Sequence, residues 1–329
     1  MDNTIFAQSI ARIRFKETKM LDRTKLEALV ESAGFADSLR MLQDSEYAEY
    51  LNKPSYEEGL KESLESFYKE MYKLTPVKEI VDVLAVRYDG HNIKSLIKGK
   101  FSGIDTYNIL VDAGTIPVES LKVMIKEESF RDIPMTLRKY VEKAIESYKN
   151  HQDPQEIDII IDKGVYEYML EIASNSKLDY LVKITKTMID VINIKSFIRI
   201  KLQDKDREFL QKIFIRGGKI DIDLFINNLN DSLDNFAGKI AHTDHYKWVK
   251  EGIEEFVKTK DIGKLEKLSD NFMINYLKNA KLVSFGPEPI VAYIIARETE
   301  IKAVRIVLTG KKNKVLPDII RERLRDLYV

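Results

Sequence analysis

The chain of 329 residues carries 53 basic and 53 acidic side chains and contains no cysteine. Because these charges balance, the sequence lacks the one-sided positive field that binds nucleic acid, and no basic run suggests a polybasic membrane tether. The absence of cysteine excludes disulfides, thiol catalysis and zinc sites built from thiolates. With only 14 glycines and 8 prolines, the chain is expected to form long elements with few turns, which favours helices over a many-stranded sheet.

No stretch of the sequence suggests a segment that enters a membrane. The first residues, Met1 to Gln8, lack the basic start and the apolar run of a secretory signal. Apolar stretches such as Ile290 to Ala296 are far shorter than the ~20 residues that a membrane helix needs. We therefore expect that the chain does not cross a bilayer.

An internal repeat is the feature on which the rest of the interpretation depends. The segment from Asp89 to Lys100 occurs again from Asp190 to Lys201, and a degenerate third copy runs from Glu300 to Arg305. In the third copy, Glu300 is expected to stand where the first two have asparagine, and Ala303 where they have serine. A repeat of this kind indicates one structural unit used several times. Repeated units of this kind are typical of scaffolds and of binding sites for partner proteins, and they are rare in catalytic centres.

Further similarities extend the repeat along the chain. Residues 145–169 and 253–277 share apolar positions at steps of three, four and seven, which places those side chains on one face of a helix. Three periodic stretches end in a small turn motif: Ala33-Gly34, Ala113-Gly114 and Gly217-Gly218. We expect these glycines to take the left-handed conformation, which glycine adopts without steric cost.

Helix starts are readable from capping patterns. Asp153 followed by Pro154 resembles an N-cap residue with proline at the first helical position, and Ser55 begins a capping-box pattern. A long helix is expected from Ile290 to about Leu308, and no segment alternates with period two. The sequence therefore predicts an all-α fold. We place three similar helical domains at residues 1–108, 109–211 and 212–329, with helices exchanged across these boundaries.

Pairs of basic residues recur on the repeated helices. Lys94 and Lys98 lie four residues apart, as do Lys195 and Arg199, so each pair projects from one side of its helix. One interpretation is a basic stripe that faces a partner or a central cavity. The other is a solvated face whose cations pair with acids on a neighbouring helix, which is the commoner arrangement. The repetition of the pair favours the first interpretation modestly.

Short polar residues recur in the same segments. Asn92 and Asn193 lie inside helices, where asparagine is mildly unfavourable, so we expect each to make a specific structural hydrogen bond. Asp89 and Asp190, one turn earlier, are the expected neighbours. We assign a structural role to Glu300 as well.

Few residues suggest catalysis. His242 and His245 lie three apart, but no third ligand with convincing spacing accompanies them, so we expect two surface histidines. Glycine-lysine segments at residues 217–219 and 310–314 lack the spacing of phosphate-binding loops. No pair of carboxylates suggests an acid and a base. We therefore expect a chain with no active site, metal or cofactor; a helical metalloenzyme using the two histidines is an alternative that metal analysis would test.

Taken together, these residues resemble a known family. The repeated Asn-Ile-Lys helix, the opening Ala11–Arg14 followed by Glu17, and the stretch Phe285–Arg305 are similar to the C subunit of archaeal and bacterial V/A-type ATPases. The d subunit of eukaryotic vacuolar ATPases belongs to the same family. The resemblance covers essentially the whole chain, and its most specific part is Tyr293–Arg305.

The resemblance implies a funnel of three similar helical domains around a pseudo-threefold axis. Its narrow end would rest on the membrane-embedded proteolipid ring, and its mouth would receive the foot of the central stalk, made of D- and F-type subunits. Such a rotor subunit binds no nucleotide and no ion, and passes torque between stalk and ring. Proton or sodium transport is thereby coupled to ATP synthesis or hydrolysis. The chain would lie at the cytoplasmic face of the membrane as a peripheral protein.

We expect the repeated helices to line the cavity that receives the stalk. Polar and charged contacts would then fix the orientation of the shaft. An alternative from another class is a helical-repeat adaptor that binds a different protein, although such repeats usually have 20–45 residues. The candidate contacts are seven basic residues: Arg87, Lys94, Lys98, Lys195, Arg199, Lys302 and Arg305.

Overall fold

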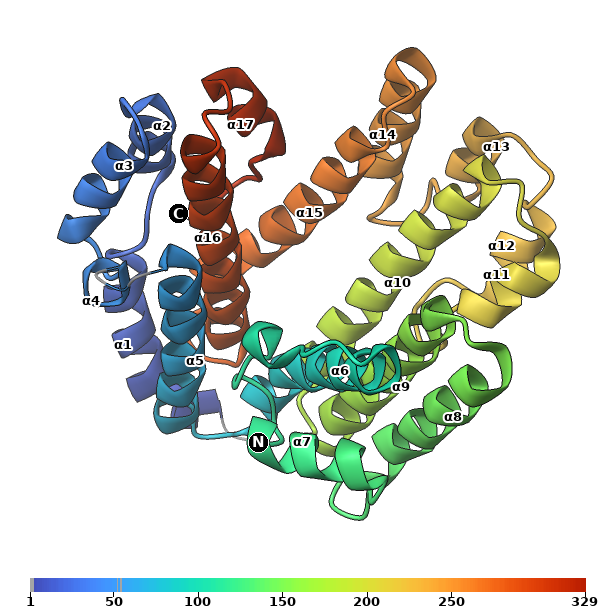
Figure 1. Ribbon diagram of the computed structural model, residues 1–329. Helices are drawn as coiled ribbons and strands as arrows, with labels where there is room; N and C mark the ends of the chain where they lie inside the picture. The colour runs from blue at the N-terminus through green and yellow to red at the C-terminus, as the bar shows by residue number, and fades with distance from the viewer. Residues whose placement is uncertain (1–2, 52, 54) are drawn as a thin grey trace. The chain divides into compact units, whose positions relative to one another are not determined.

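The computed structural model describes residues 3–51, 53 and 55–329, and every regular element within them is helical (Figure 1). The all-α prediction is therefore confirmed. The chain divides into two compact units. Unit 1 consists of Met1–Pro76 and Lys247–Val329, and unit 2 of Val77–Tyr246. The first and last parts of the sequence thus fold together.

Unit 2 is organised around helix α9, which packs against α8, α6 and α10. Two of its helices, α6 and α10, have 24 residues each, a length that the scarcity of glycine and proline permits. The helices of unit 2 are α6 (Glu79–Ser102), α7 (Val118–Glu127), α8 (Met135–His151), α9 (Pro154–Asn175), α10 (Asp179–Leu202), α11 (Arg207–Ile213), α12 (Ile222–Asn227) and α13 (Leu233–Lys239), with the 3-10 helix η3 (Tyr107–Ile109).

Unit 1 is organised around the 25-residue helix α16, against which α1, α2, α3, α5, α15 and α17 pack. In Figure 1 the N-terminal helices, drawn in blue, lie beside the red helix α16. The helices of unit 1 are α1 (Ala7–Glu17), α2 (Arg23–Glu31), α3 (Phe35–Met41), α4 (Ala48–Leu51), α5 (Tyr56–Leu74), α14 (Tyr246–Thr259), α15 (Gly263–Lys278), α16 (Glu288–Lys312) and α17 (Pro317–Arg323), with the 3-10 helices η1 (Asn3–Phe6), η2 (Leu42–Asp44) and η4 (Asn279–Leu282).

The capping patterns predict some helix starts better than others. The Asp153 side chain accepts a hydrogen bond from the backbone N–H of Gln155, and Pro154 is the first residue of α9. Ser55 precedes α5 as expected, but its side chain makes no capping bond. The similar segments 145–169 and 253–277 fall on α8–α9 and on α14–α15, so each forms two successive helices.

The core of each unit follows the apolar periodicity. On α9, Ile157 and Met169 are fully buried, as are their counterparts Leu265 and Leu277 on α15. Helix α16 is buried on all sides from Ile290 to Glu298, because neighbouring helices surround it. Within the part of the chain that the structure describes, no helix is long and apolar enough to cross a membrane.

Candidate functional site

On α6, the carboxylate of Asp89 holds the loop that leads into α7. It is fully buried and accepts hydrogen bonds from the Thr115 N–H (2.9 Å), the Thr115 hydroxyl (2.6 Å) and the Ile116 N–H (3.0 Å). Unpaired backbone N–H groups are costly in a protein interior. The carboxylate therefore stabilises the entry into α7.

Two further side chains of α6 bind the same segment. Asn92 forms a pair of hydrogen bonds with the backbone of Val111, at 2.8 and 2.9 Å. Its partner is thus this loop, and not the aspartate one turn earlier. The ammonium group of Lys100 donates to the carbonyl oxygens of Ile125 (3.0 Å) and Lys126 (3.3 Å) in the last turn of α7. Since helix ends leave carbonyls unpaired, this lysine caps the far end of α7.

Helix α10 repeats these contacts with α12. The Asp190 carboxylate is fully buried and accepts from the N–H groups of Lys219 (2.8 Å) and Ile220 (3.1 Å). The amide of Asn193 pairs with the backbone of Ile215 at 2.7 and 2.9 Å. Lys201 donates to carbonyl oxygens after α12, those of residues 228 (3.0 Å), 229 (2.5 Å) and 231 (2.5 Å).

Helix α16 uses the same positions, but its partner helix comes from the N-terminus of the chain. Glu300 accepts a hydrogen bond from the Leu21 N–H at 2.6 Å, just before α2. Lys311 donates to the carbonyl oxygen of Ser32 at 2.7 Å, just after α2. The third copy of the unit is therefore completed by residues at the opposite end of the sequence.

These contacts correct the register of the third copy. In each of the three long helices the lysine follows the carboxylate by eleven residues, so Glu300 corresponds to Asp89 and Asp190. The asparagine position is then occupied by Ala303, and the expectation that Glu300 replaces asparagine was wrong. We call each carboxylate and its lysine, which together hold the two ends of one short helix, a helix clamp. The three clamps are Asp89–Lys100, Asp190–Lys201 and Glu300–Lys311.

Two of the recurring glycines make room for the clamp carboxylates and do not form a left-handed turn. Gly114 and Gly218 do not have positive φ angles. A Cβ atom on Gly114 would overlap Oδ1 of Asp89, and one on Gly218 would overlap Oδ1 of Asp190. Gly34 has extended backbone (φ 175°) and open space around its Cα, so it belongs to neither class. The expectation of left-handed glycine is confirmed at Gly217, whose φ is 99°, and was wrong at Gly34, Gly114 and Gly218. At Gly114 and Gly218 the close approach of a carboxylate is what requires glycine.

The clamp on α16 is embedded in a larger buried charge cluster. The Arg297 guanidinium lies 2.5 Å from Oε1 of Glu300 and 3.3 Å from Oε2 of Glu46, and it stacks over the Tyr47 ring at 4.6 Å. The Tyr47 hydroxyl donates to Oε1 of Glu300 at 2.8 Å. Burial raises the pKa of Glu300, while the positive charge of Arg297 opposes the rise. Burial also acts to lower the pKa of Arg297, but Tyr47, Glu300 and Glu46 outweigh it and hold the guanidinium protonated.

Among the described residues, no such cation lies in hydrogen-bond range of the carboxylates on α6 and α10. Burial raises the pKa of Asp89 from 3.8 to about 6, although the bonds from Thr115 and Ile116 act in the opposite direction. Near Asp190, Nε2 of His245 lies 3.6 Å from Oδ2, which is too long for a hydrogen bond. His245 is 2% exposed, so the expectation of a surface histidine was wrong there, whereas His242 is exposed.

The basic candidates Lys94 and Lys98 are engaged in ion pairs within unit 2. Lys94 lies 2.6 Å from Asp162, and Lys98 lies 2.6 Å from Asp158. Both aspartates belong to α9, so the pairs connect α6 to α9. Half-exposed pairs of this kind contribute about 0–1 kcal/mol. Each lysine can therefore exchange its aspartate for a carboxylate of a partner at little cost.

The other candidates are distributed over both units. Arg87 is half-buried and donates from Nε to the carbonyl oxygen of Leu84 at 2.9 Å. Lys195 is half-buried and Arg199 exposed on α10. The remaining two are exposed on α16 of unit 1: Lys302 and Arg305.

The side chains of the three helix clamps hold one helix against another. Each clamp carboxylate accepts at least one backbone N–H group, and each clamp lysine donates to at least one backbone carbonyl. Among the described residues, no group of three His, Asp or Glu side chains could hold a metal ion. Sequence reasoning missed the clamp lysines, although Lys100 and Lys201 end the two clear copies of the repeat. It also missed Arg297 and Tyr47, whose roles depend on contacts between distant parts of the chain.

The described part of the molecule is thus an all-helical framework whose buried polar groups fasten one helix to another. The chain belongs to the ATP synthase (C/AC39) subunit family, whose model matches residues 9–323. It is 28% identical to the C subunit of the A-type ATP synthase of Methanocaldococcus jannaschii, covering 99% of this chain and 88% of that protein. It is 24% identical to the C subunit of the V-type sodium ATPase of Enterococcus hirae, over 96% of this chain and 97% of that protein. The chain is therefore a subunit of a rotary ATPase or ATP synthase.

Proposed function

We propose that this chain is the non-catalytic rotor subunit that joins the central stalk to the membrane proteolipid ring and transmits torque between them. The observation that carries the proposal is the family match over residues 9–323. In this role the chain would lie at the cytoplasmic face of the membrane, bound to the ring. Rotation passing through it would couple proton or sodium transport to ATP synthesis or hydrolysis.

The helix clamps support a mechanical role. A subunit that transmits torque must deform less than the elements it joins, and densely packed helices resist deformation. The clamps add polar links at both ends of a short helix, at Asp89 and Lys100, for example, so each short helix is fixed to a long one. The carboxylate ends of the clamps are buried, and buried polar contacts are satisfied in one geometry only, which favours a rigid unit.

We further propose that three similar helical domains surround a cavity for the foot of the stalk. The triplication is supported by the three clamps, of which the third joins α16 to α2. On this proposal the stalk subunits, of D and F type, meet a ring of positive charge. The proposed contacts are Arg87, Lys94, Lys98, Lys195, Arg199, Lys302 and Arg305.

Charge reversal of the repeated lysines tests the contact surface. We expect Lys94→Glu and Lys195→Glu, combined, to lower the affinity for purified stalk subunits about tenfold or more, because two favourable charge pairs become repulsive. The measurement is binding of labelled D–F stalk to the immobilised chain at low and at physiological salt. Lys122→Glu is a matched control, since Lys122 is also ion-paired in unit 2, to Glu119, and lies outside the proposed surface.

A charge swap separates contact from stability. Lys94→Glu with Asp162→Lys restores an ion pair between α6 and α9 but still removes the positive charge at position 94. The swapped variant should fold like the wild type and bind the stalk as weakly as Lys94→Glu alone. Unchanged binding by the reversed variants would remove these lysines from the surface. Failure of the wild-type chain to bind either stalk or ring would overturn the proposed function itself.

A further inference from the structure

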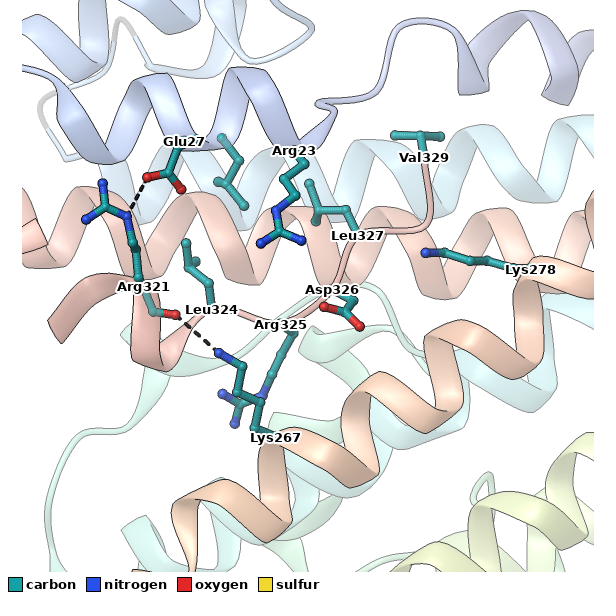
Figure 2. Close-up of a pocket in the computed structure, with 11 residues that line it drawn as sticks. Arg23, Glu27, Lys267, Lys278, Arg321, Leu324, Arg325, Asp326, Leu327 and Val329 are labelled. Atoms are coloured by element: carbon teal, nitrogen blue, oxygen red, sulfur yellow. Dashed lines mark hydrogen bonds and ion pairs between the residues drawn. The ribbon is translucent and has the colours of Figure 1, made fainter. Parts of the chain in front are cut away.

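A small pocket in unit 1 is lined by several positively charged side chains, none of which belongs to the proposed contact surface for the stalk. The pocket has a volume of about 320 Å³ and lies between α2, α15, α17 and the C-terminal segment (Figure 2). Five cationic side chains line it, against the carboxylates of Glu27 and Asp326. The five are Arg23, Lys267, Lys278, Arg321 and Arg325.

Three of the five cations are already committed to partners. Arg321 binds the carboxylates of Glu27 and Glu31, and Arg325 lies 2.8 Å from Asp270. Lys267 donates to the carbonyl oxygens of Arg321 (3.3 Å) and Glu322 (3.2 Å), at the end of α17. Only part of the hydrogen-bonding capacity of the Lys267 ammonium is used, because that group has three donors.

The other two cations have no partner of their own. Arg23 on α2 and Lys278 on α15 make no hydrogen bond or ion pair with another described residue. In Figure 2 both side chains extend toward the pocket, Arg23 from α2 and Lys278 from the end of α15. Asp326 lies in the same pocket and offsets one positive charge. Because Arg321 and Arg325 are already paired with acids, the remaining cations are Arg23, Lys267 and Lys278, which face the single carboxylate of Asp326, so positive charge is in excess among these side chains.

The lowered pKa of Lys267 indicates that holding these cations close together costs free energy. Burial, Arg325 and Lys264 together lower the pKa of Lys267, and Asp326 and Glu322 oppose them only in part. Like charges held this close repel one another, and an anion that binds among them would remove that repulsion. Arginine and lysine are the side chains that recognise phosphate, arginine through paired N–H donors.

We propose that this pocket binds a phosphate group, either free or carried by a small molecule or a lipid headgroup. A dianion matches the unpartnered Arg23 and Lys278 together with the spare donor of Lys267 better than a single carboxylate does. The volume is at the lower end of the ~300–1,000 Å³ found for ligand sites, so the ligand is small or enters only by its phosphate. Leu26, Leu324 and Leu327 form an apolar wall that would keep the anion from being fully hydrated.

The test uses the full chain and inorganic phosphate, with chloride at the same ionic strength as reference. Phosphate should raise the melting temperature of the wild type, and isothermal titration should give saturable binding. Arg23→Gln and Lys278→Gln should each weaken binding about tenfold, the usual loss for one charge-assisted hydrogen bond. Neither side chain has a partner in the described fold, so both variants should melt like the wild type in chloride.

A neighbouring lysine provides the matched control. Lys264→Gln removes a positive charge near Lys267 without removing a lining side chain, and should bind phosphate within about twofold of the wild type. Equal loss in all three variants would mean nonspecific attraction and would overturn the proposal. Absence of phosphate binding by the wild type would overturn it as well, including the case in which an acidic peptide binds there instead.

Vesicles distinguish the two sources of phosphate. If a lipid headgroup is the ligand, the chain should sediment with phosphatidic acid vesicles and not with phosphatidylcholine vesicles. Free phosphate should then displace it, and Arg23→Gln should reduce sedimentation. Binding of free phosphate without sedimentation assigns the pocket to a soluble phosphate. Because stalk binding is measured separately, loss of the phosphate site and loss of the proposed function are distinguishable.

Discussion

Helices α6 and α16 place a carboxylate at the same position of the repeat, but the surroundings of the two carboxylates differ. Asp89 is satisfied entirely by hydrogen-bond donors from one loop, two N–H groups and a hydroxyl. Glu300 receives only one N–H from its loop, and Tyr47 and the Arg297 guanidinium complete its shell. The loop on α6 follows in sequence, whereas the loop on α16 comes from the opposite end of the chain. The same task is thus achieved by neutral donors in one unit and by a buried ion pair in the other.

The largest loss of stability is expected at Glu300, because its buried negative charge is balanced by the Arg297 guanidinium. Arg297→Met leaves Glu300 buried without its cation, which should lower the free energy of unfolding by about 3–5 kcal/mol. Arg297→Met with Glu300→Gln should be less destabilised than the single variant, because glutamine is neutral: its amide oxygen can accept from the Leu21 N–H, and its NH2 group can donate to the Tyr47 hydroxyl oxygen. Urea unfolding of the wild type, the two single variants and the double variant measures the coupling free energy between Arg297 and Glu300. Arg305→Met, at an exposed position of the same helix, should change stability by less than about 0.5 kcal/mol. Simple additivity of the two substitutions would contradict the ionic interpretation.

A smaller loss of stability is expected at Gly114, where the absence of a side chain leaves room for the Asp89 carboxylate. Gly114→Ala should destabilise unit 2 by about 1–3 kcal/mol, because the added methyl group overlaps Oδ1 of Asp89 and forces the loop away from it. Gly34→Ala is the matched control in unit 1, where nothing lies within 4 Å of the added atom. That variant should unfold like the wild type. Equal losses at the two positions would show that backbone flexibility, and not close approach, decides the choice of glycine.

A further effect is the pH dependence of stability that Asp89 contributes. Its pKa is about 6 in the folded chain, against an ordinary value of 3.8, so the folded state binds the proton more tightly than the unfolded state. Its contribution to the free energy of unfolding is therefore greatest below about pH 4 and falls as pH rises to about 6. Asp89→Asn should lack this component. The check is the difference between wild-type and variant stability across that range, and a difference independent of pH would contradict the raised pKa.

Much of the fold could be predicted because helix formation depends on nearby residues. The start of α9 at Pro154 and the long helix observed at Glu288–Lys312 were both visible from local capping and periodicity. The buried faces of α9 and α15 followed from the same steps of three, four and seven. Ser55 shows the limit of that reasoning, because a capping pattern does not ensure that the side chain makes the bond.

The polar positions could be predicted only in part. The repeat identified Asp89 and Asp190 as structural, and it already contained the clamp lysines that follow them. The register of the third copy was misplaced, since Glu300 was matched to asparagine by the short sequence around it. Its partners, Leu21 and Tyr47, lie at the other end of the chain, and no periodicity connects them to α16. Contacts of this kind become visible only when the fold brings distant segments together.

The coupling role is tested most directly by ATP-driven ion transport in an assembled enzyme prepared with and without this chain. Omission should leave ATP hydrolysis by the soluble part intact and abolish transport through the ring. Adding back the purified chain should restore transport, and the Lys94→Glu, Lys195→Glu variant should restore less of it. Transport at the wild-type rate without the chain would contradict a rotor that joins stalk to ring.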